Sequence, residues 1–298
     1  MRKRTNYIVA LALVMVATLV SCKVDQKEPI YEPGGEITQN PGRVKVQDPN
    51  GQIPNGQQFT IINEQGKTVA TLGNNDYVDL EAGRYYLLGY TGTEYFTLNG
   101  ATRSLSPSEA TLQLQSTDGI LLPEGLVGGI STFIVIEDQV TVINVSFSPL
   151  TRKLCIEAQP DGIDLQNITQ TQVTLSGLAA GINLYQGFGA VAKSAGSYTA
   201  QSDAKMVNGK LVVELNLLGM DVDADQMLTI KLTANNDKSY HVTMSLKQIL
   251  ESFNSGSPAA TFTVNVRLSA DNEETEGSLS GTIIDWEEGE EVEIVGEN

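Results

Sequence analysis

The stretch TFTVNVRLS, residues 261–269, decides the fold class. Its apolar side chains, Phe262, Val264, Val266 and Leu268, alternate with polar ones at every second position. Successive side chains of a strand point to opposite faces of a sheet, so this period indicates a strand with one buried face. Half-buried strands are typical of antiparallel sheets.

The same period recurs over most of the chain. It is found in RVKVQ (43–47), QFTIINEQGKTVATL (58–72), YVDLEAGRYYLLGYTG (77–92), VTVINVSFS (140–148), KLVVELNLLG (210–219) and LTIKLTA (228–234). In the third of these runs, Tyr86, Leu88 and Tyr90 share one face, and in the fourth Ile143 shares its face with Phe147. Turn sequences separate the runs at short intervals, which favours β-sandwiches over parallel sheets.

One helix is expected, in MSLKQILESFNSG (244–256). Its apolar residues have the spacing of one helix face: Leu246, Ile249, Leu250 and Phe253. Ser245 and Gln248 fit a capping box at its start, and Gly256 lies beyond its end.

A domain boundary is expected near SFSPLTRKL (146–154), because Pro149 interrupts a strand-like run there. The prediction is therefore an all-β chain with two tandem antiparallel β-sandwich domains, at 43–148 and 149–298. The short helix belongs to the second domain.

The N-terminus has the pattern of a lipoprotein signal peptide, residues 1–21. A basic start and a short apolar run end in LVSC, which matches the lipobox of bacterial lipoproteins. The apolar run Tyr7–Val20 is too short for a membrane span, which needs about 20 residues. We expect cleavage before Cys22, diacylglycerol on its thiol and an acyl chain such as palmitate on its new amino group. The alternative is an ordinary signal peptide that ends at a chance cysteine.

Residues 22–42 are predicted to be a flexible linker. They contain three prolines and three glycines and little apolar periodicity. Such a segment would lift the folded part away from the membrane.

Composition excludes several classes of function. The formal net charge of −17 argues against binding to nucleic acid through phosphate contacts. With Cys22 lipidated, Cys155 has no partner, so neither an internal disulfide nor a cysteine zinc site is expected. We interpret Cys155 as a bystander thiol in a strand.

No motif for catalysis or for a cofactor stands out, and the chain is predicted not to be an enzyme. The one histidine, His241, lies in a strand-like run and is interpreted as structural. DVDADQ (221–226) has acids at alternate positions, as calcium loops do. Gln226 and Leu232 stand where such a loop needs glycine and glutamate, so an acidic turn is expected and no metal.

Two further features have competing interpretations. A glycan-binding surface would need exposed aromatic side chains, but Trp286 is the single tryptophan, and packing explains at least some of Tyr85, Tyr86 and Tyr90. The acidic C-terminus DWEEGEEVEIVGEN (285–298) is either a frayed end or a last strand that pairs with a partner.

Four features together resemble the FimB-like fimbrial subunit family of Bacteroidales-type bacteria, which includes the anchor and related subunits of type V pili. They are the lipobox ending in Cys22, the run YVDLEAGRYYLLGY (77–90), the run VTLSGLAAGINLYQGF (173–188), and the final strands VNVRLS (264–269) with GTIIDWEEGEE (281–291). The resemblance implies two transthyretin-like β-sandwich domains, outer-membrane attachment by lipid at the cell surface, other fimbrial subunits as partners, a part in cell adhesion and no enzymatic activity.

The resemblance also implies a choice of role that depends on Arg43. Pilin subunits of this type lose an N-terminal segment to an arginine-specific protease, and a neighbour's strand fills the groove that opens. Arg43 lies just before the first strand, where such a maturation cut would fall. The linker before it holds no strand to withdraw, so we expect a lipid-anchored anchor or accessory subunit that holds a pilin by strand complementation. The alternatives are a processed shaft or tip subunit, a surface glycan-binding lipoprotein of a nutrient-uptake system, and a secreted hydrolase with an unrecognised acid pair.

Overall fold

The computed structural model of the chain describes residues 40–49, 51, 57–99, 107–145, 147–236, 238–270 and 279–288. All of them belong to one compact unit, Gln39–Asn298. The predicted signal peptide, Cys22, most of the linker and the last ten residues lie outside the described part.

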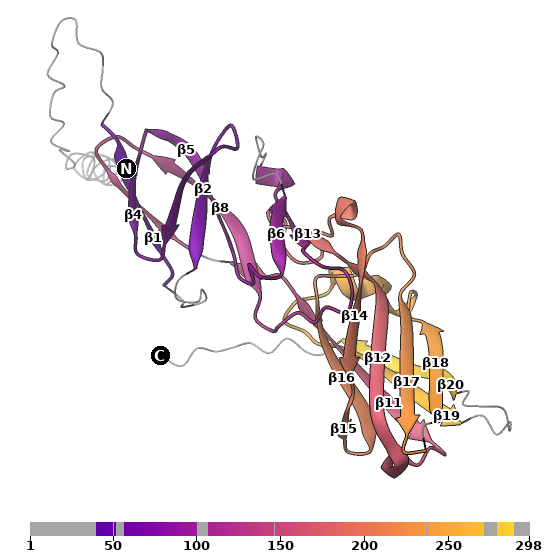
Figure 1. The fold of residues 1–298 in the computed structure, drawn as a ribbon. Coiled ribbons are helices and arrows are strands. Elements are labelled where there is room, and N and C mark those ends of the chain that lie inside the picture. Colours follow the sequence, from indigo (N-terminus) through magenta and orange to yellow (C-terminus); the bar gives the residue numbers. More distant parts are fainter. Residues whose placement is uncertain are drawn as a thin grey trace, which may run out of the picture. The chain divides into compact units, whose positions relative to one another are not determined.

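Two sheets form the first half of this unit (Figure 1). One has the strand order β4-β1-β9 and the other the order β10-β8-β5-β2-β3. Their strands are β1 (Gly42–Gln47), β2 (Gln58–Asn63), β3 (Thr68–Gly73), β4 (Tyr77–Leu80), β5 (Gly83–Tyr90), β8 (Val127–Val135), β9 (Val140–Asn144) and β10 (Ser148–Pro149). The alternating residues that face inward from both sheets make a core that includes Val44, Val46, Phe59, Ile143 and Phe147.

Two larger sheets form the second half. Their strand orders are β15-β16-β11-β19-β20 and β14-β12-β17-β18. The strands are β11 (Arg152–Asp161), β12 (Ile168–Ala179), β14 (Ser197–Asp203), β15 (Lys205–Val207), β16 (Lys210–Leu217), β17 (Met227–Ala234), β18 (Ser239–Ser245), β19 (Phe262–Ala270) and β20 (Leu279–Glu288). The stretch 261–269 becomes β19, and Phe262, Val264, Val266 and Leu268 are fully buried in the core between the sheets.

A small third sheet joins the two halves. Its order is β13-β7-β6, where β6 (Phe96–Asn99) and β7 (Thr111–Leu114) come from the first half and β13 (Gly181–Asn183) from the second. Leu112 and Ile182 pair across it and are both buried in the larger core. The boundary at 148/149 stays a prediction, because this core draws on residues from both sides of it.

Strand β5 is covered on both faces. Tyr85 and Leu87 belong to the first core, while Leu88 and its half-buried neighbours Tyr86 and Tyr90 pack against the second. The Tyr85 ring stacks on Phe133 with centroids 5.8 Å apart, and its hydroxyl donates to the carbonyl of Glu81. Packing therefore explains all three of these tyrosines.

The predicted helix is shorter and tighter than the sequence suggests. Residues Ile249–Ser255 form the 3₁₀-helix η4, after the single turns η1 (Pro107–Glu109), η2 (Leu165–Asn167) and η3 (Lys193–Ala195). Leu250 and Phe253 are buried as expected. The capping box is wrong, because Gln248 itself is the N-cap and makes no side-chain capping bond.

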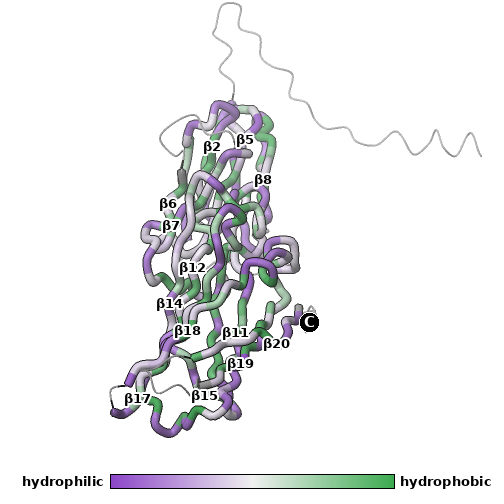
Figure 2. The backbone as a smooth tube through the Cα atoms, turned by 90° about the vertical axis from the view of Figure 1, so that its right-hand side faces the viewer, coloured by the Kyte–Doolittle hydropathy of each residue, from purple (hydrophilic) through white to green (hydrophobic). Residues whose placement is uncertain are grey.

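The all-β class is confirmed, and hydrophilic and hydrophobic stretches alternate along the chain in Figure 2. Most neighbouring strands are antiparallel, but β1 runs parallel to β9 and β11 parallel to β19. Within the described residues, no helix has the length and apolar character needed to cross a membrane.

Candidate functional site

Arg43 is the second residue of the first strand, β1. The sequence predicts instead that it lies just before that strand. Strand β1 begins at Gly42 and is the middle strand of its sheet, with β4 on one side and β9 on the other. Arg43 lies opposite Asp79 of β4 and Val140 of β9. Its amide donates to the carbonyl of Gln139 at 2.8 Å. The backbone at Arg43 is therefore held from both sides.

The Arg43 side chain is held as well. Its Nε lies 2.7 Å from Oδ1 of Asp79 and its Nη2 lies 3.0 Å from Oδ2, which is a two-pronged guanidinium–carboxylate pair. The hydrogen bonds from Arg43 lower the pKa of Asp79, and those same bonds raise the pKa of Arg43. Both side chains stay exposed to solvent.

A shallow hollow lies where the chain enters β1. Its volume is about 470 Å³, and it is lined by Asn40, Pro41, Arg43, Asp79, Asp138, Gln139 and Val140. Asn40 donates to the carboxylate of Asp138 at 3.2 Å, which ties the entering chain to the β8–β9 turn. The hollow is polar and open, so it offers no enclosed site for a small molecule.

Strand β9 forms an exposed edge beside this hollow. Val140 is 61% exposed and Val142 49% exposed. Ile134, near the end of β8, and Ile136, in the β8–β9 turn, are exposed to a similar degree. We call these four residues the β9 edge. β9 carries no charged side chain, and its register with β1 is unbroken from Val140 to Asn144. Edges with exposed apolar side chains and no charges to blunt them are templates for a further strand.

Strand β20 is another edge strand with exposed large apolar side chains, as are β15 with Met206 and Val207, β4 with Tyr77 and β3 with Val69. Trp286 is 54% exposed, and Ile284 is the extra residue of a β-bulge in the pairing with β19. Asp285 accepts a hydrogen bond from Asn265 at 2.6 Å, and Glu287 adds a second acid. Bulges and charges are devices that blunt an edge against pairing, so β20 fits a partner strand less well than β9.

The acidic loop 221–226 is a turn in which each acid has its own partner. Asp223 pairs with Lys193 at 3.2 Å and Asp225 with Lys247 at 2.7 Å. The Gln226 side chain is buried and donates to the carbonyls of Gly177 and Asp221. Among the described residues, no three His, Cys, Asp or Glu side chains are grouped to hold a metal ion.

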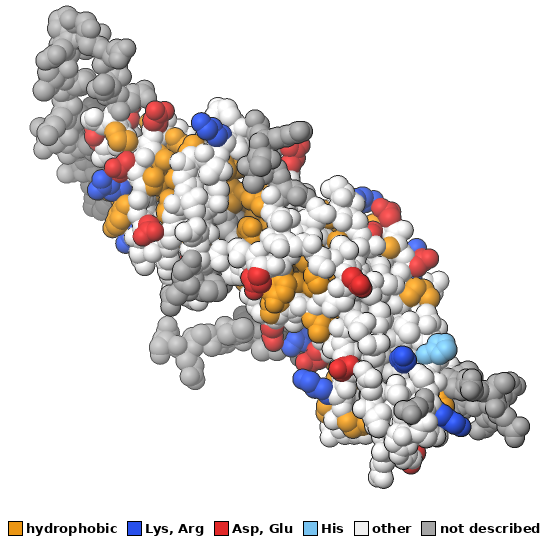
Figure 3. All heavy atoms as spheres, viewed as in Figure 1, with side chains coloured by type: hydrophobic (Ala, Val, Ile, Leu, Met, Phe, Trp, Pro, Cys, Tyr) orange, Lys and Arg blue, Asp and Glu red, His pale blue; other side chains and the backbone are white. Residues whose placement is uncertain are grey.

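Cys155 and His241 lie apart from the exposed edges. Cys155 is a free cysteine buried on β11, and burial, with Glu157 and Glu214 nearby, raises the pKa of its thiol to about 11. His241 lies opposite Lys231 on the outer side of β18 and is the pale blue side chain in Figure 3. On the face drawn there, the described Lys and Arg side chains are scattered among acidic ones.

The β9 edge does not follow from the pattern of its run alone. The alternation puts Ile143 and Phe147 on one face, and both are buried. The signal for the edge was the opposite face, where Val140 and Val142 are apolar too. A strand that is apolar on both faces has a second surface to cover.

Comparison with known proteins places this geometry in context. The family model described as fimbrillin-A associated anchor proteins Mfa1 and Mfa2 matches residues 54–291, which is more than half of the chain. Among solved structures, the chain is similar to a Bacteroides ovatus ATCC 8483 protein proposed to be an adhesin, with a TM-score of 0.54, 13% identity, and coverage of 80% of this chain and 95% of that one. A second proposed adhesin from Bacteroides ovatus has a TM-score of 0.50 and 10% identity, with coverage of 83% and 93%. At these identities the likeness shows the fold alone. None of the curated protein sequences matches this chain.

Proposed function

The chain belongs to the family of fimbrillin-A associated anchor proteins Mfa1 and Mfa2, and from this premise we propose that it is a non-enzymatic lipoprotein that anchors a fimbria to the outer membrane. Lipid on Cys22 attaches the protein to the outer membrane at the cell surface. Each buried CH₂ contributes about 0.8 kcal/mol, so two or three acyl chains hold the protein firmly. Residues 22–42 act as the tether, and the folded part holds the fimbrial subunit.

The position of Arg43 within β1 is the observation that supports an uncut anchor most directly. A cut after Arg43 would leave Val44–Gln47 in the sheet, including Val44 and Val46, which are fully buried. It would release only two residues of the strand, Gly42 and Arg43, so it would not open a groove as long as a strand. A processed subunit needs such a groove, whereas an anchor does not.

The β9 edge is the surface we propose for the fimbrial subunit. A partner strand that pairs with the outer side of β9 would extend the order β4-β1-β9 by one strand. Its main-chain hydrogen bonds would supply affinity, and its alternate side chains would cover Val140 and Val142. Ile134 and Ile136 widen the apolar surface available to it.

Intact mass and N-terminal analysis of the protein from its native cell envelope test this proposal. A chain that begins at acylated Cys22 is the expected result. A chain that begins at Val44 without lipid would mean cleavage after Arg43. The protein would then be a polymerising shaft or tip subunit, and the anchor role would be wrong while the family membership remained.

A further inference from the structure

A pocket of about 260 Å³ lies in the second half of the chain, away from the β9 edge. It is lined by Gly162, Ile163, Asp164, Asn167, Ile168, Ala234, Asn235, Asn236, Tyr240 and Leu279. Three separate segments supply these residues: the β11–β12 connection with the start of β12, the β17–β18 hairpin, and the start of β20. The volume is just under the range of about 300–1,000 Å³ that is usual for ligand pockets, so it suits one ring of a small ligand.

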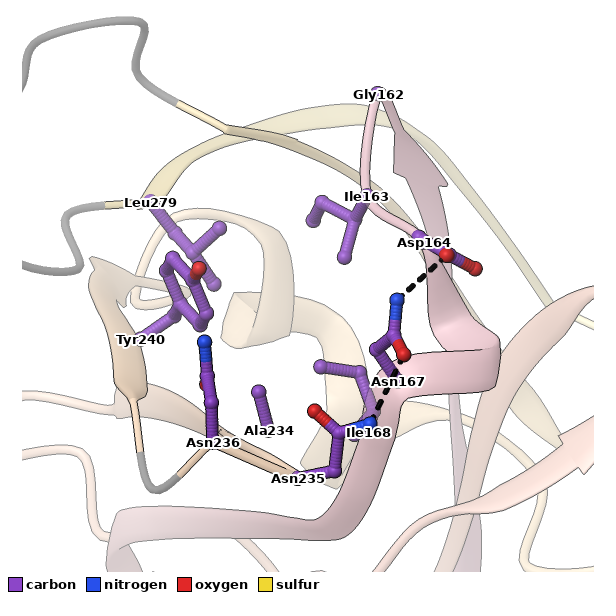
Figure 4. Close-up of a pocket in the computed structure, with 10 residues that line it drawn as sticks. All are labelled: Gly162, Ile163, Asp164, Asn167, Ile168, Ala234, Asn235, Asn236, Tyr240 and Leu279. Atoms are coloured by element: carbon purple, nitrogen blue, oxygen red, sulfur yellow. Dashed lines mark hydrogen bonds between the residues drawn. The ribbon is translucent and has the colours of Figure 1, made fainter.

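One side of the pocket carries a connected row of hydrogen-bonding side chains (Figure 4). The Asn167 amide donates to Asp164 at 2.7 Å, and the Asn235 amide donates to the side-chain oxygen of Asn167 at 3.0 Å. The backbone amide of Gln166 also donates to Asp164. These bonds fix the orientation of each group before any ligand arrives.

The row keeps unused hydrogen-bonding capacity. A carboxylate has about four acceptor positions and an amide side chain has two donors and an acceptor oxygen. Asp164 accepts two bonds, and the Asn235 oxygen has no partner within the described part of the chain. The pocket therefore presents acceptors and donors side by side at its rim.

The opposite side and the floor are mostly apolar, with the Asn236 amide beside Tyr240. Figure 4 shows Tyr240 and Leu279 facing Ile163, with Ala234 between them at the base. Ala234 and Leu279 are buried, while the Tyr240 ring is half exposed. An aromatic ring with a polar end, set across from oriented amides, can pack against one face of a ligand while its rim is hydrogen-bonded.

We propose that this pocket binds one pyranose unit of a neutral glycan. A pyranose ring carries hydroxyl groups around its rim, which both donate and accept, and apolar C–H groups on its faces. These two sets match the amide row and the tyrosine wall. Asp164 is the only charged side chain among the ten that line the pocket, so carboxylated or sialylated sugars are disfavoured.

Binding of the full chain to a glycan array tests the proposal. The chain is solubilised in a detergent without a sugar headgroup, and the array holds neutral hexose and N-acetylhexosamine oligosaccharides beside sialylated and uronate-containing ones. We expect retention of at least one neutral glycan and none of the anionic ones. Calorimetric titration with the best neutral oligosaccharide then gives the affinity.

Two pairs of variants locate the binding. Asn235→Ala and Tyr240→Ala are each expected to weaken affinity at least tenfold, while the exposed controls Asn144→Ala and Tyr185→Ala change it less than twofold. Tyr240→Phe keeps the ring, so it is expected to weaken binding less than Tyr240→Ala and serves if either alanine variant unfolds. Absence of any neutral hit, a preference for anionic glycans, or unchanged binding by the pocket variants would overturn the proposal. None of these outcomes bears on the lipid at Cys22, so the anchor role is tested separately.

Discussion

Arg43 and Asp79 lie opposite each other on β1 and β4 and are joined by two hydrogen bonds of 2.7 and 3.0 Å. The pair couples the first strand of the described chain to the rest of its sheet at the point where a maturation cut would fall. Both the backbone and the side chain of Arg43 are thus engaged in the uncut protein.

The pair predicts a pH-dependent contribution to stability. The pKa of Asp79 is lower in the folded chain than its usual 3.8, chiefly because Arg43 donates to it. Its contribution is therefore present above 3.8 and is lost as pH falls through the lower folded value. We expect Asp79→Asn to lower the urea midpoint slightly near neutral pH, with the difference from the native chain shrinking below 3.8.

The double variant provides the control for this pair. Arg43→Gln/Asp79→Asn is expected to unfold at the same urea concentration as Asp79→Asn alone, because either change removes the whole interaction. If Asp79→Asn matched the native chain near neutral pH, the pair would contribute nothing to stability, which is common for exposed ion pairs.

Arg152 is expected to be the most sensitive charged residue of the described chain. It is fully buried, its Nε and Nη1 donate to the carbonyls of Ala260 and Phe253 at 2.9 Å, and its guanidinium lies 5.1 Å from the Phe253 ring centroid. Arg152→Met leaves buried carbonyls without these donors, at about 1–3 kcal/mol for each. We expect the free energy of unfolding, measured in urea, to fall by about 2–6 kcal/mol.

Arg84→Met is the matched control for that measurement. Arg84 is exposed, and its nearest carboxylate, Glu64, is 3.8 Å away. Surface changes of this kind stay within about 0.5 kcal/mol. Equal effects of the two substitutions would show that the burial of Arg152 does not matter to stability.

Local pattern predicted the strands well and their partners poorly. The alternation in 261–269 correctly identifies β19 and its four buried residues. A period of two says which side chains share a face, but it does not say which strand lies alongside. The parallel pairs β1–β9 and β11–β19 and the small sheet β13-β7-β6 were therefore not foreseen. Helical spacing correctly predicted that Leu250 and Phe253 are buried. It did not predict that their helix is a 3₁₀-helix, because that choice depends on how the segment packs against the core.

The candidate sites show the same limit. Arg43 was singled out from sequence, but its partner Asp79 depends on the register of β1 against β4. The pocket around Asn235 and Tyr240 is formed by three segments. In the sequence, each of them has the pattern of an ordinary polar turn or strand end. Only the folded chain brings them together.

Cys155 predicts how the native protein responds to thiol reagents. The pKa of this buried thiol is raised to about 11, so little thiolate exists near neutral pH. If Cys22 carries lipid as proposed, Cys155 is the one free thiol of the native chain from cells, and it is expected to react slowly with an aromatic disulfide reagent. After urea is added, we expect one equivalent of the reagent's thiolate to be released per chain. A Cys155→Ser chain is then expected to release none. A fast equivalent in the native protein would mean that a second, unmodified thiol is present.

The β9 edge predicts a variant that folds normally but loses its fimbriae. Val142 is 49% exposed and lies in register with Lys45, so Val142→Glu places a carboxylate beside a cation and is expected to leave thermal stability unchanged. A charge on an exposed edge discourages strand addition. In cells, we expect most fimbrial protein to move from the envelope fraction to the medium, as measured by immunoblot. Val69→Glu on β3, at the edge of the neighbouring sheet, is the control and is expected to retain its fimbriae. Retention by both variants would exclude the β9 edge as the docking strand, because a partner strand paired there could not ignore a carboxylate at Val142.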